Sequence, residues 1–135
     1  ILATDLDSSV LAKGIAGVYE EDKMAGVSPE RLQRWFKKGT KEQAGLVQVI
    51  PELQAIVTFK RLNLIEPWPM HGPLDIIFCR NVVIYFDKAT QRVLFERFAS
   101  LLDEEGYLLI GHSENLFQLS TRFRLLQQTV YAKFR

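Results

Sequence analysis

The sequence predicts an α/β fold in which helices cover the faces of an open, mostly parallel β-sheet. Short apolar runs alternate with segments of helical periodicity, in the order strand-helix, insertion, strand, strand-helix-strand and hairpin. In addition, residues 75–79 (Asp-Ile-Ile-Phe-Cys) are continuously apolar after the first, as expected of a parallel strand covered on both faces. We expect one domain, residues 1–135, because this length suits a single modest core.

The chain opens on a predicted strand, Ile1 to Thr4, which ends at Asp5. Ser8 or Ser9 is expected to cap a short helix that weakens toward Gly17. Because the first residues resemble the end of a buried strand, we expect the sequence to have been cut from a longer one.

Residues 19–55 interrupt the regular order and are predicted to form a small inserted β-subdomain. Ser28-Pro29 marks a helix start, with serine at the cap and proline at the first helical position. The helix is expected to end at residues 37–39 (Lys-Lys-Gly), where cations suit the negative end of the helix dipole. Residues 45–50 are predicted to form a strand.

Regular α/β order resumes with a predicted strand over residues 56–62, followed by a proline-rich loop. Asp87 is expected to cap a helix whose apolar residues recur at helical spacing, and Gly106 is expected to stop it. The remaining predicted strands are residues 107–110 and a closing antiparallel pair, residues 123–126 and 129–134.

Composition narrows the possible partners. The 17 basic and 16 acidic residues are spread along the chain, so the basic stripe typical of nucleic-acid binding is missing and we expect no nucleic-acid partner. No apolar stretch approaches the roughly 20 residues that span a bilayer, so no direct membrane insertion is expected. The single cysteine, Cys79, is expected to be a small core residue, and this cysteine usage fits a cytoplasmic location.

Polar residues follow three of the predicted strands, at the carboxyl ends where open α/β sheets bind ligands. Asp5 could accept two hydrogen bonds from the ribose hydroxyls of a nucleotide, or it could be an ordinary turn aspartate. Asn63 could read an adenine edge through its amide, or it could simply form a turn at the strand end.

The most informative segment is residues 78–87, Phe-Cys-Arg-Asn-Val-Val-Ile-Tyr-Phe-Asp. It places Arg80 and Asn81 directly after the carboxyl end of a buried strand. Burying charged and polar side chains there costs free energy unless a ligand needs their charge and hydrogen bonds. Taken singly, Arg80 could form a surface salt bridge and Tyr85 could be an aromatic at the edge of the core. Their combination favours a site.

This segment, together with residues 111–115 (Gly-His-Ser-Glu-Asn) and 3–7 (Ala-Thr-Asp-Leu-Asp), resembles the chemoreceptor glutamate methyltransferase family of bacterial chemotaxis, CheR. The resemblance runs through nearly the whole chain. It implies a Rossmann-like methyltransferase sheet that binds S-adenosylmethionine, releases S-adenosylhomocysteine, and methylates glutamate side chains of chemoreceptors during adaptation.

The resemblance also implies roles for individual residues. Asp5 matches the residue that binds the cofactor ribose, and Asn63 with Leu64 matches the pair that contacts the adenine. Arg80 and Asn81 match residues at the methionine end of the cofactor. Tyr85 matches the tyrosine that flanks the transferred methyl group, and we expect Arg80 and Tyr85 to be the catalytic residues.

The inserted residues 19–55 match a β-subdomain that docks on receptors. The cytoplasmic helical region of chemoreceptors is therefore the expected partner. In some family members a receptor C-terminal tail peptide adds to a strand edge of this subdomain, and the sequence does not decide whether this chain captures such a peptide.

The family pattern also places a glycine-rich first motif, a first strand and an N-terminal helical domain before the position of Ile1. We therefore expect a sheet that lacks its first strand, with a central gap and exposed edges. We expect such a fragment to be inactive alone.

The expected chemistry needs little from the protein beyond alignment. A sulfonium methyl group is already electrophilic, and a glutamate side chain, whose ordinary pKa is about 4.3, is already ionised at neutral pH. No general base is needed, so we expect His112 to shape its loop through a hydrogen bond. His71 is expected to be a surface residue, and two distant histidines predict no metal site.

Two alternatives stay open at this point. One is a methyltransferase for another protein substrate; nucleic-acid methyltransferases usually carry prolines where this chain has Val82 and Val83. The other is a non-catalytic fragment or binding module that keeps the docking insertion.

Overall fold

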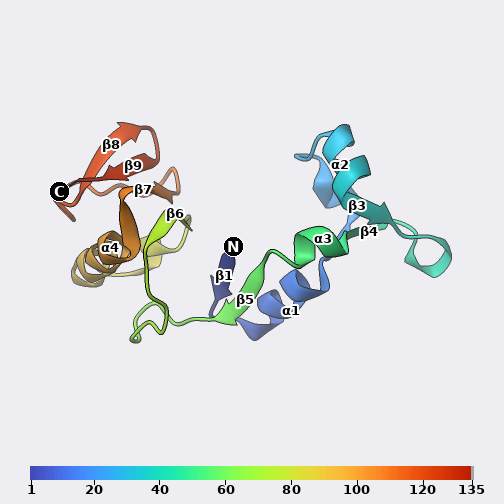
Figure 1. Cartoon of the computed structure of the whole chain (residues 1–135), viewed down its shortest axis with the longest axis horizontal. Helices are drawn as coiled ribbons and strands as arrows, with labels where there is room; N and C mark the ends of the chain where they lie inside the picture. Colours follow the sequence, from blue (N-terminus) through green and yellow to red (C-terminus); the bar gives the residue numbers. More distant parts are fainter. Residues whose placement is uncertain (135) are drawn as a thin grey trace. The chain divides into compact units, whose positions relative to one another are not determined.

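The computed structural model describes residues 1–134, which form a mixed α/β structure. The residues fall into two compact units, Ile1–Asn63 and Leu64–Arg135, and each is described by itself. Their strands pair into three sheets: a parallel pair and a small antiparallel sheet in the first unit, and a four-stranded sheet in the second (Figure 1).

The parallel pair consists of β1 (Leu2–Asp5) and β5 (Thr58–Arg61), with Asp5 opposite Arg61 at the carboxyl end. Helix α1 (Ser8–Ala16) lies beside these strands (Figure 1). The predicted strands of residues 1–4 and 56–62 are thus confirmed, with slightly different ends.

Helix α1 is capped by Asp7, and the prediction of Ser8 or Ser9 at this position was wrong. The Asp7 carboxylate accepts a hydrogen bond from the Ser9 backbone N–H at 2.7 Å, and Asp7 has the extended backbone expected of a cap. Ser8 is already helical. Gly17 ends the helix in the left-handed conformation that glycine adopts without strain.

The antiparallel sheet has the order β2-β4-β3. Its strands are β2 (Val18–Glu20), β3 (Phe36–Lys38) and β4 (Leu46–Val49), and the intervening segments form η1 (Glu21–Met24), α2 (Pro29–Trp35) and η2 (Lys41–Gln43). A short helix, α3 (Pro51–Gln54), follows β4. Ser28 caps α2 and Pro29 occupies its first turn, as predicted.

Helix α2 ends at Trp35, so the prediction that it continues to residues 37–39 was wrong. Phe36–Lys38 form β3, which pairs antiparallel with β4 from Phe36↔Val49 to Lys38↔Val47. The backbone groups of β3 form hydrogen bonds with β4, and these replace the hydrogen bonds that another turn of helix would have supplied.

The second unit contains a four-stranded sheet of order β6-β7-β9-β8. Its strands are β6 (Leu74–Cys79), β7 (Leu102–Ile110), β8 (Phe123–Gln127) and β9 (Val130–Lys133). Strands β6 and β7 are parallel, and β7, β9 and β8 pair antiparallel, which confirms the predicted closing pair.

Helix α4 (Lys88–Leu101) lies beside this sheet (Figure 1). Its side chains Leu94, Phe95 and Phe98 belong to the core of this unit. Asp87 caps it as predicted, accepting from the Thr90 backbone N–H at 2.8 Å. Among residues 1–134, no helix combines the length and apolar character that crossing a membrane requires.

Helix α4 ends earlier than the sequence predicted. Leu102 already belongs to β7, opposite Leu74 of β6, and Gly106 lies inside that strand instead of stopping a helix. The register between β6 and β7 shifts after Leu74, which leaves the extra residues of β7 as an irregularity.

Strand β6 is covered differently from the prediction. Within the structure Ile76 is 50% exposed and Phe78 69% exposed, whereas Cys79 is buried and Ile77 packs against the core. Successive strand residues face opposite sides, and the core of this unit lies on the Ile77 and Cys79 side only. The expectation of cover on both faces was therefore wrong for this strand as described.

The core of the second unit depends on Leu94, which is 1% exposed, whereas its neighbour Val93 is 51% exposed. Leu94→Ala should lower the free energy of unfolding by about 2–5 kcal/mol, because it leaves a cavity under the sheet. Val93→Ala is the matched control and should change that free energy by less than about 0.5 kcal/mol.

Urea titration followed by Trp68 fluorescence measures both variants, since Trp68 stacks on Phe98 with ring centroids 5.3 Å apart. A Trp35→Phe background removes the other tryptophan. Equal effects of the two substitutions would contradict the assignment of the core face of α4.

Candidate functional site

Asp5 and Asn63 come together at the carboxyl end of the parallel pair. Asp5 closes β1, and its carbonyl accepts a hydrogen bond from the Leu62 backbone N–H at 2.9 Å. Asn63 is the next residue of the chain and is half-buried. The parallel register therefore brings these two predicted site residues to one edge of their sheet.

The loop that carries Asp5 is held in place by hydrogen bonds. The Asp7 backbone N–H donates to Oδ1 of Asp5 at 2.9 Å, and Nε of Arg61 donates to the Leu6 carbonyl at 3.1 Å. Hydrogen bonds from the Ser9 side chain and backbone lower the pKa of Asp7. Asp5 is exposed and retains lone pairs for hydroxyl donors.

A cavity of about 340 Å³ opens beside Asp5. It is lined by Ala3, Thr4, Asp5, Val10, Leu11, Lys13, Gly14, Tyr19 and Phe59, all within the first unit. A Cβ atom at position 14 would lie 2.4 Å from the Phe59 ring, so a larger residue there would require the ring to shift.

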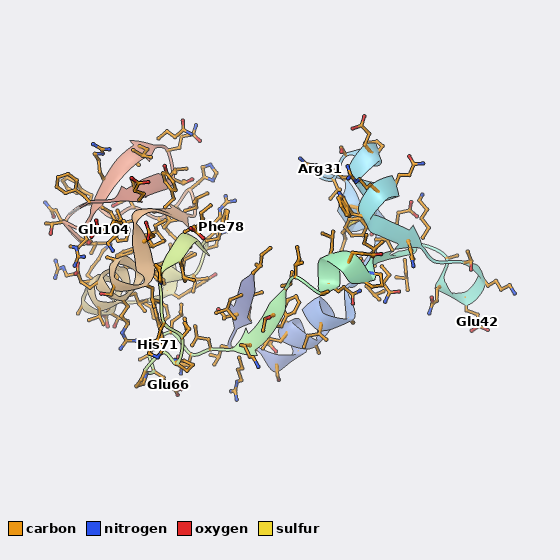
Figure 2. All side chains as sticks on the ribbon, viewed as in Figure 1. Arg31, Glu42, Glu66, His71, Phe78 and Glu104 are labelled. Carbon is orange, nitrogen blue, oxygen red and sulfur yellow. The ribbon has the colours of Figure 1, made fainter. Side chains whose placement is uncertain are left out.

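Leu64 begins the second unit and packs against its core. Its carbonyl accepts hydrogen bonds from Nε1 of Trp68 at 3.1 Å and Nη1 of Arg97 at 2.9 Å. The loop after Leu64 is thereby tied to helix α4. Figure 2 shows His71 in the same loop, where it is exposed as predicted.

Arg80, Asn81 and Tyr85 lie in the loop that follows β6. Asn81 has a φ of 58°, and residues Val83–Tyr85 form a short 3-10 helix, η3. Arg80 is exposed and Tyr85 is 81% exposed, so the loop presents both side chains to solvent within this structure.

Nη2 of Arg80 lies 3.4 Å from Nδ1 of His112. A guanidinium only donates hydrogen bonds, so Nδ1 of His112 is the acceptor in this contact. The contact agrees with the expectation that His112 shapes its loop.

Glu114 is the residue that the sequence analysis missed. Its carboxylate accepts hydrogen bonds from the backbone N–H groups of Asn81, Val82, Val83, Ile84 and Gly111, and the residue is 9% exposed. The signal that could have found it was an acidic residue in the loop after a buried strand, three positions beyond Gly111.

Gln91 holds the same loop from the other side. Its side-chain amide donates to the carbonyls of Val83 and Phe86, both at 2.9 Å, and it is 8% exposed. The backbone of the Arg80–Phe86 segment is thus tied to α4 through Gln91 and to the β7 end through Glu114.

The structure therefore groups the predicted residues in two sets. Asp5 and Asn63 share one strand edge in the first unit, and Leu64, Arg80, Asn81 and Tyr85 belong to the second. Within residues 1–134, no three His, Cys, Asp or Glu side chains cluster in a way that could hold a metal ion.

Comparison with known proteins gives a consistent result over almost the whole chain. Residues 1–132 match the family model described as "CheR methyltransferase, SAM binding domain". Three relatives show the similarity. The "Chemotaxis protein methyltransferase" of Escherichia coli (strain K12) is 46% identical over 133 residues, which cover 98% of this chain and 46% of the relative.

The protein of the same name from Klebsiella aerogenes is 48% identical over 132 residues, covering 97% of this chain and 46% of the relative. The "Chemotaxis protein methyltransferase 2" of Pseudomonas aeruginosa is 44% identical over 133 residues, covering 98% and 48% respectively. The chain spans about half the length of the curated relatives it matches.

Cys79, the last residue of β6, is buried as predicted. Burial and, to a smaller extent, the nearby charge of Glu114 raise the pKa of its thiol to about 12. At pH 8 only about one molecule in ten thousand would carry the thiolate. Iodoacetamide should therefore leave Cys79 largely unmodified in the folded protein and react readily in urea. Mass spectrometry measures both rates, and equal rates would contradict the burial of this thiol.

Proposed function

The chain belongs to the CheR methyltransferase family, through its domain for binding S-adenosylmethionine, and we propose that the protein containing it methylates glutamate carboxylates of bacterial chemoreceptors. The observation that carries this proposal is the family match over residues 1–132. The polar residues at the carboxyl ends of β1, β5 and β6 support it, because α/β sheets bind ligands there. The relatives are themselves named chemotaxis methyltransferases.

The residues at these strand ends fit the cofactor chemically. The exposed Asp5 carboxylate beside its cavity suits the two ribose hydroxyls, and the Asn63 amide with the Leu64 side chain suits an adenine ring. Arg80 and Asn81 carry the charge and hydrogen bonds that the amino-acid end of the cofactor needs. We assign these five residues to cofactor binding.

The catalytic role that we assign to Arg80 and Tyr85 is orientation. When bound, S-adenosylmethionine supplies an electrophilic methyl group on a sulfonium. A glutamate carboxylate is ionised at neutral pH, so no residue of this chain has to remove a proton. The Arg80 guanidinium would orient the carboxylate by hydrogen bonds, and the exposed Tyr85 ring would exclude water from one side of it.

The inserted residues 19–55 are proposed to dock on receptors. Their three-stranded sheet leaves β2 and β3 at its edges, and an extended receptor tail peptide could add to such an edge through backbone hydrogen bonds. The methylated partner would be the cytoplasmic helical region of a chemoreceptor, so we place the protein in the cytoplasm.

We also propose that the parallel pairs β1–β5 and β6–β7 are parts of a Rossmann-like fold in the complete gene product. The support is that β1 with β5 and β6 with β7 are parallel pairs whose carboxyl ends carry the candidate residues. Folds of this kind bind ligands at the carboxyl ends of their parallel strands.

Binding of S-adenosylhomocysteine tests the cofactor assignment. In the complete gene product containing this sequence, Asp5→Ala should weaken binding roughly 10- to 100-fold, because a charged acceptor for two hydroxyl groups is lost. Isothermal titration calorimetry measures the change. Asp75→Ala, an exposed aspartate at the amino end of β6, is the matched control and should bind as the unaltered protein does.

If the unaltered protein failed to bind S-adenosylhomocysteine, the enzymatic proposal would fall, and a receptor-binding module without catalysis would remain. If Asp5→Ala and Asp75→Ala had equal effects, the enzyme could stand but the assignment of Asp5 would not.

The methylated group identifies the reaction. With methyl-labelled cofactor and a chemoreceptor fragment, the label should be released as methanol by mild alkali, because a carboxylate methyl ester hydrolyses and an N-methyl group does not. Arg80→Ala should lower kcat/KM about 10- to 100-fold through the loss of a charge-assisted hydrogen bond. Arg124→Ala, an exposed arginine on β8, is the control. Alkali-stable label would contradict glutamate methylation.

A further inference from the structure

The carboxylate of Glu114 is nearly buried and is surrounded by backbone donors. Oε1 accepts from the N–H groups of Val82, Val83 and Ile84 at 3.0, 2.8 and 3.3 Å. Oε2 accepts from Asn81 at 3.1 Å and from Gly111 at 2.6 Å. Five main-chain donors from two separate loops thus converge on one side chain.

This environment explains how a carboxylate can be buried here. A buried charge is costly unless hydrogen bonds or an opposite charge replace its water. The salt bridges found within residues 1–134 do not include Glu114, so the backbone dipoles carry the compensation. Such an arrangement of successive N–H groups is an anion-binding nest, which requires an unusual local backbone. Asn81 supplies it with its φ of 58°.

Gly111 makes the close approach possible. A Cβ atom at this position would lie 2.4 Å from Oδ1 of Asn81, 2.9 Å from Oε2 of Glu114 and 3.0 Å from the Asn81 backbone nitrogen. Any larger residue would push the end of β7 away from the loop after β6. Glycine is therefore required by space at this position.

We propose that Glu114 is a positioning residue: its carboxylate fixes the backbone of residues 81–84 and thereby sets the directions of the Arg80, Asn81 and Tyr85 side chains. The functional part of this inference rests on the proposed methyltransferase activity. Glu114 would touch neither cofactor nor substrate, since its two oxygens are occupied by the main chain.

The test uses Glu114→Gln in the complete gene product. Glutamine has the same shape but only one acceptor oxygen, and its NH₂ group would face N–H donors on one side of the nest. Amide hydrogen exchange followed by mass spectrometry should show at least about tenfold faster exchange across residues 81–84, as expected when charge-assisted bonds are lost. Exchange in the buried part of α4 should not change.

The same variant should bind S-adenosylhomocysteine about tenfold or more weakly, and its kcat should fall, at a temperature where circular dichroism shows it fully folded. This condition separates positioning from a loss of stability. Glu105→Gln, an exposed glutamate on β7, is the matched control and should change neither exchange nor binding.

Gly111→Ala provides a second variant that leaves the carboxylate intact and displaces the same loop by steric contact. If Glu114→Gln does not fold, Gly111→Ala tests the inference in its place. It should speed amide exchange across residues 81–84 and weaken the binding of S-adenosylhomocysteine, as expected for Glu114→Gln.

Unchanged exchange across residues 81–84 would overturn the structural part of the inference. Faster exchange with unchanged affinity and kcat would overturn its functional part. Failure of the unaltered protein to bind S-adenosylhomocysteine would instead overturn the proposed function, and hydrogen exchange would still judge whether Glu114 holds the loop.

Discussion

The hydrogen bonds to the Glu114 carboxylate are the constraint on which the β6 end of the candidate site depends. Strands β6 and β7 are parallel neighbours, and these hydrogen bonds join the loop after β6 to the loop after β7. Without them, five main-chain N–H groups would lack these partners and the left-handed Asn81 would lose its support. The exposed Arg80 and Tyr85 therefore owe their positions to a side chain that is itself nearly buried.

The side chains that hold the loops are distinct from the exposed side chains that would contact a ligand. Helix α4 fills the core with Leu94, Phe95 and Phe98, and the same helix uses Gln91 to hold the carbonyls of Val83 and Phe86. Helix α4 thus contributes both to the packing of the core and, together with Glu114, to the support of the loop. In the first unit, the Asp5 loop is held by hydrogen bonds from the Asp7 backbone and the Arg61 side chain, which leave the Asp5 carboxylate exposed. Both arrangements suit residues that must meet a ligand with little reorganisation.

Elements with their own periodicity could be predicted from the sequence, and elements set by distant pairing could not. Helix α4, its Asp87 cap and the Ser28-Pro29 start of α2 follow from local residue preferences. Strands β2 and β3 have only three residues each and exist because β4 lies between them. The early end of α4 at Leu101 depends on the shifted register between β6 and β7, which no local pattern encodes.

Glu114 was missed for the same reason, since four of its five partners lie about 30 residues earlier in the chain. The cofactor roles of Asp5, Asn63, Leu64, Arg80 and Asn81 came from the family resemblance and stay predictions.

We propose that Asp5, Asn63, Arg80 and Asn81 bind S-adenosylmethionine. A crystal structure of the complete gene product with S-adenosylhomocysteine tests it most directly. We expect the Asp5 carboxylate within about 3 Å of both ribose hydroxyls, with Arg80 and Asn81 at the amino-acid end of the ligand. A bound ligand without a contact to Asp5, or without one to Arg80, would contradict this assignment.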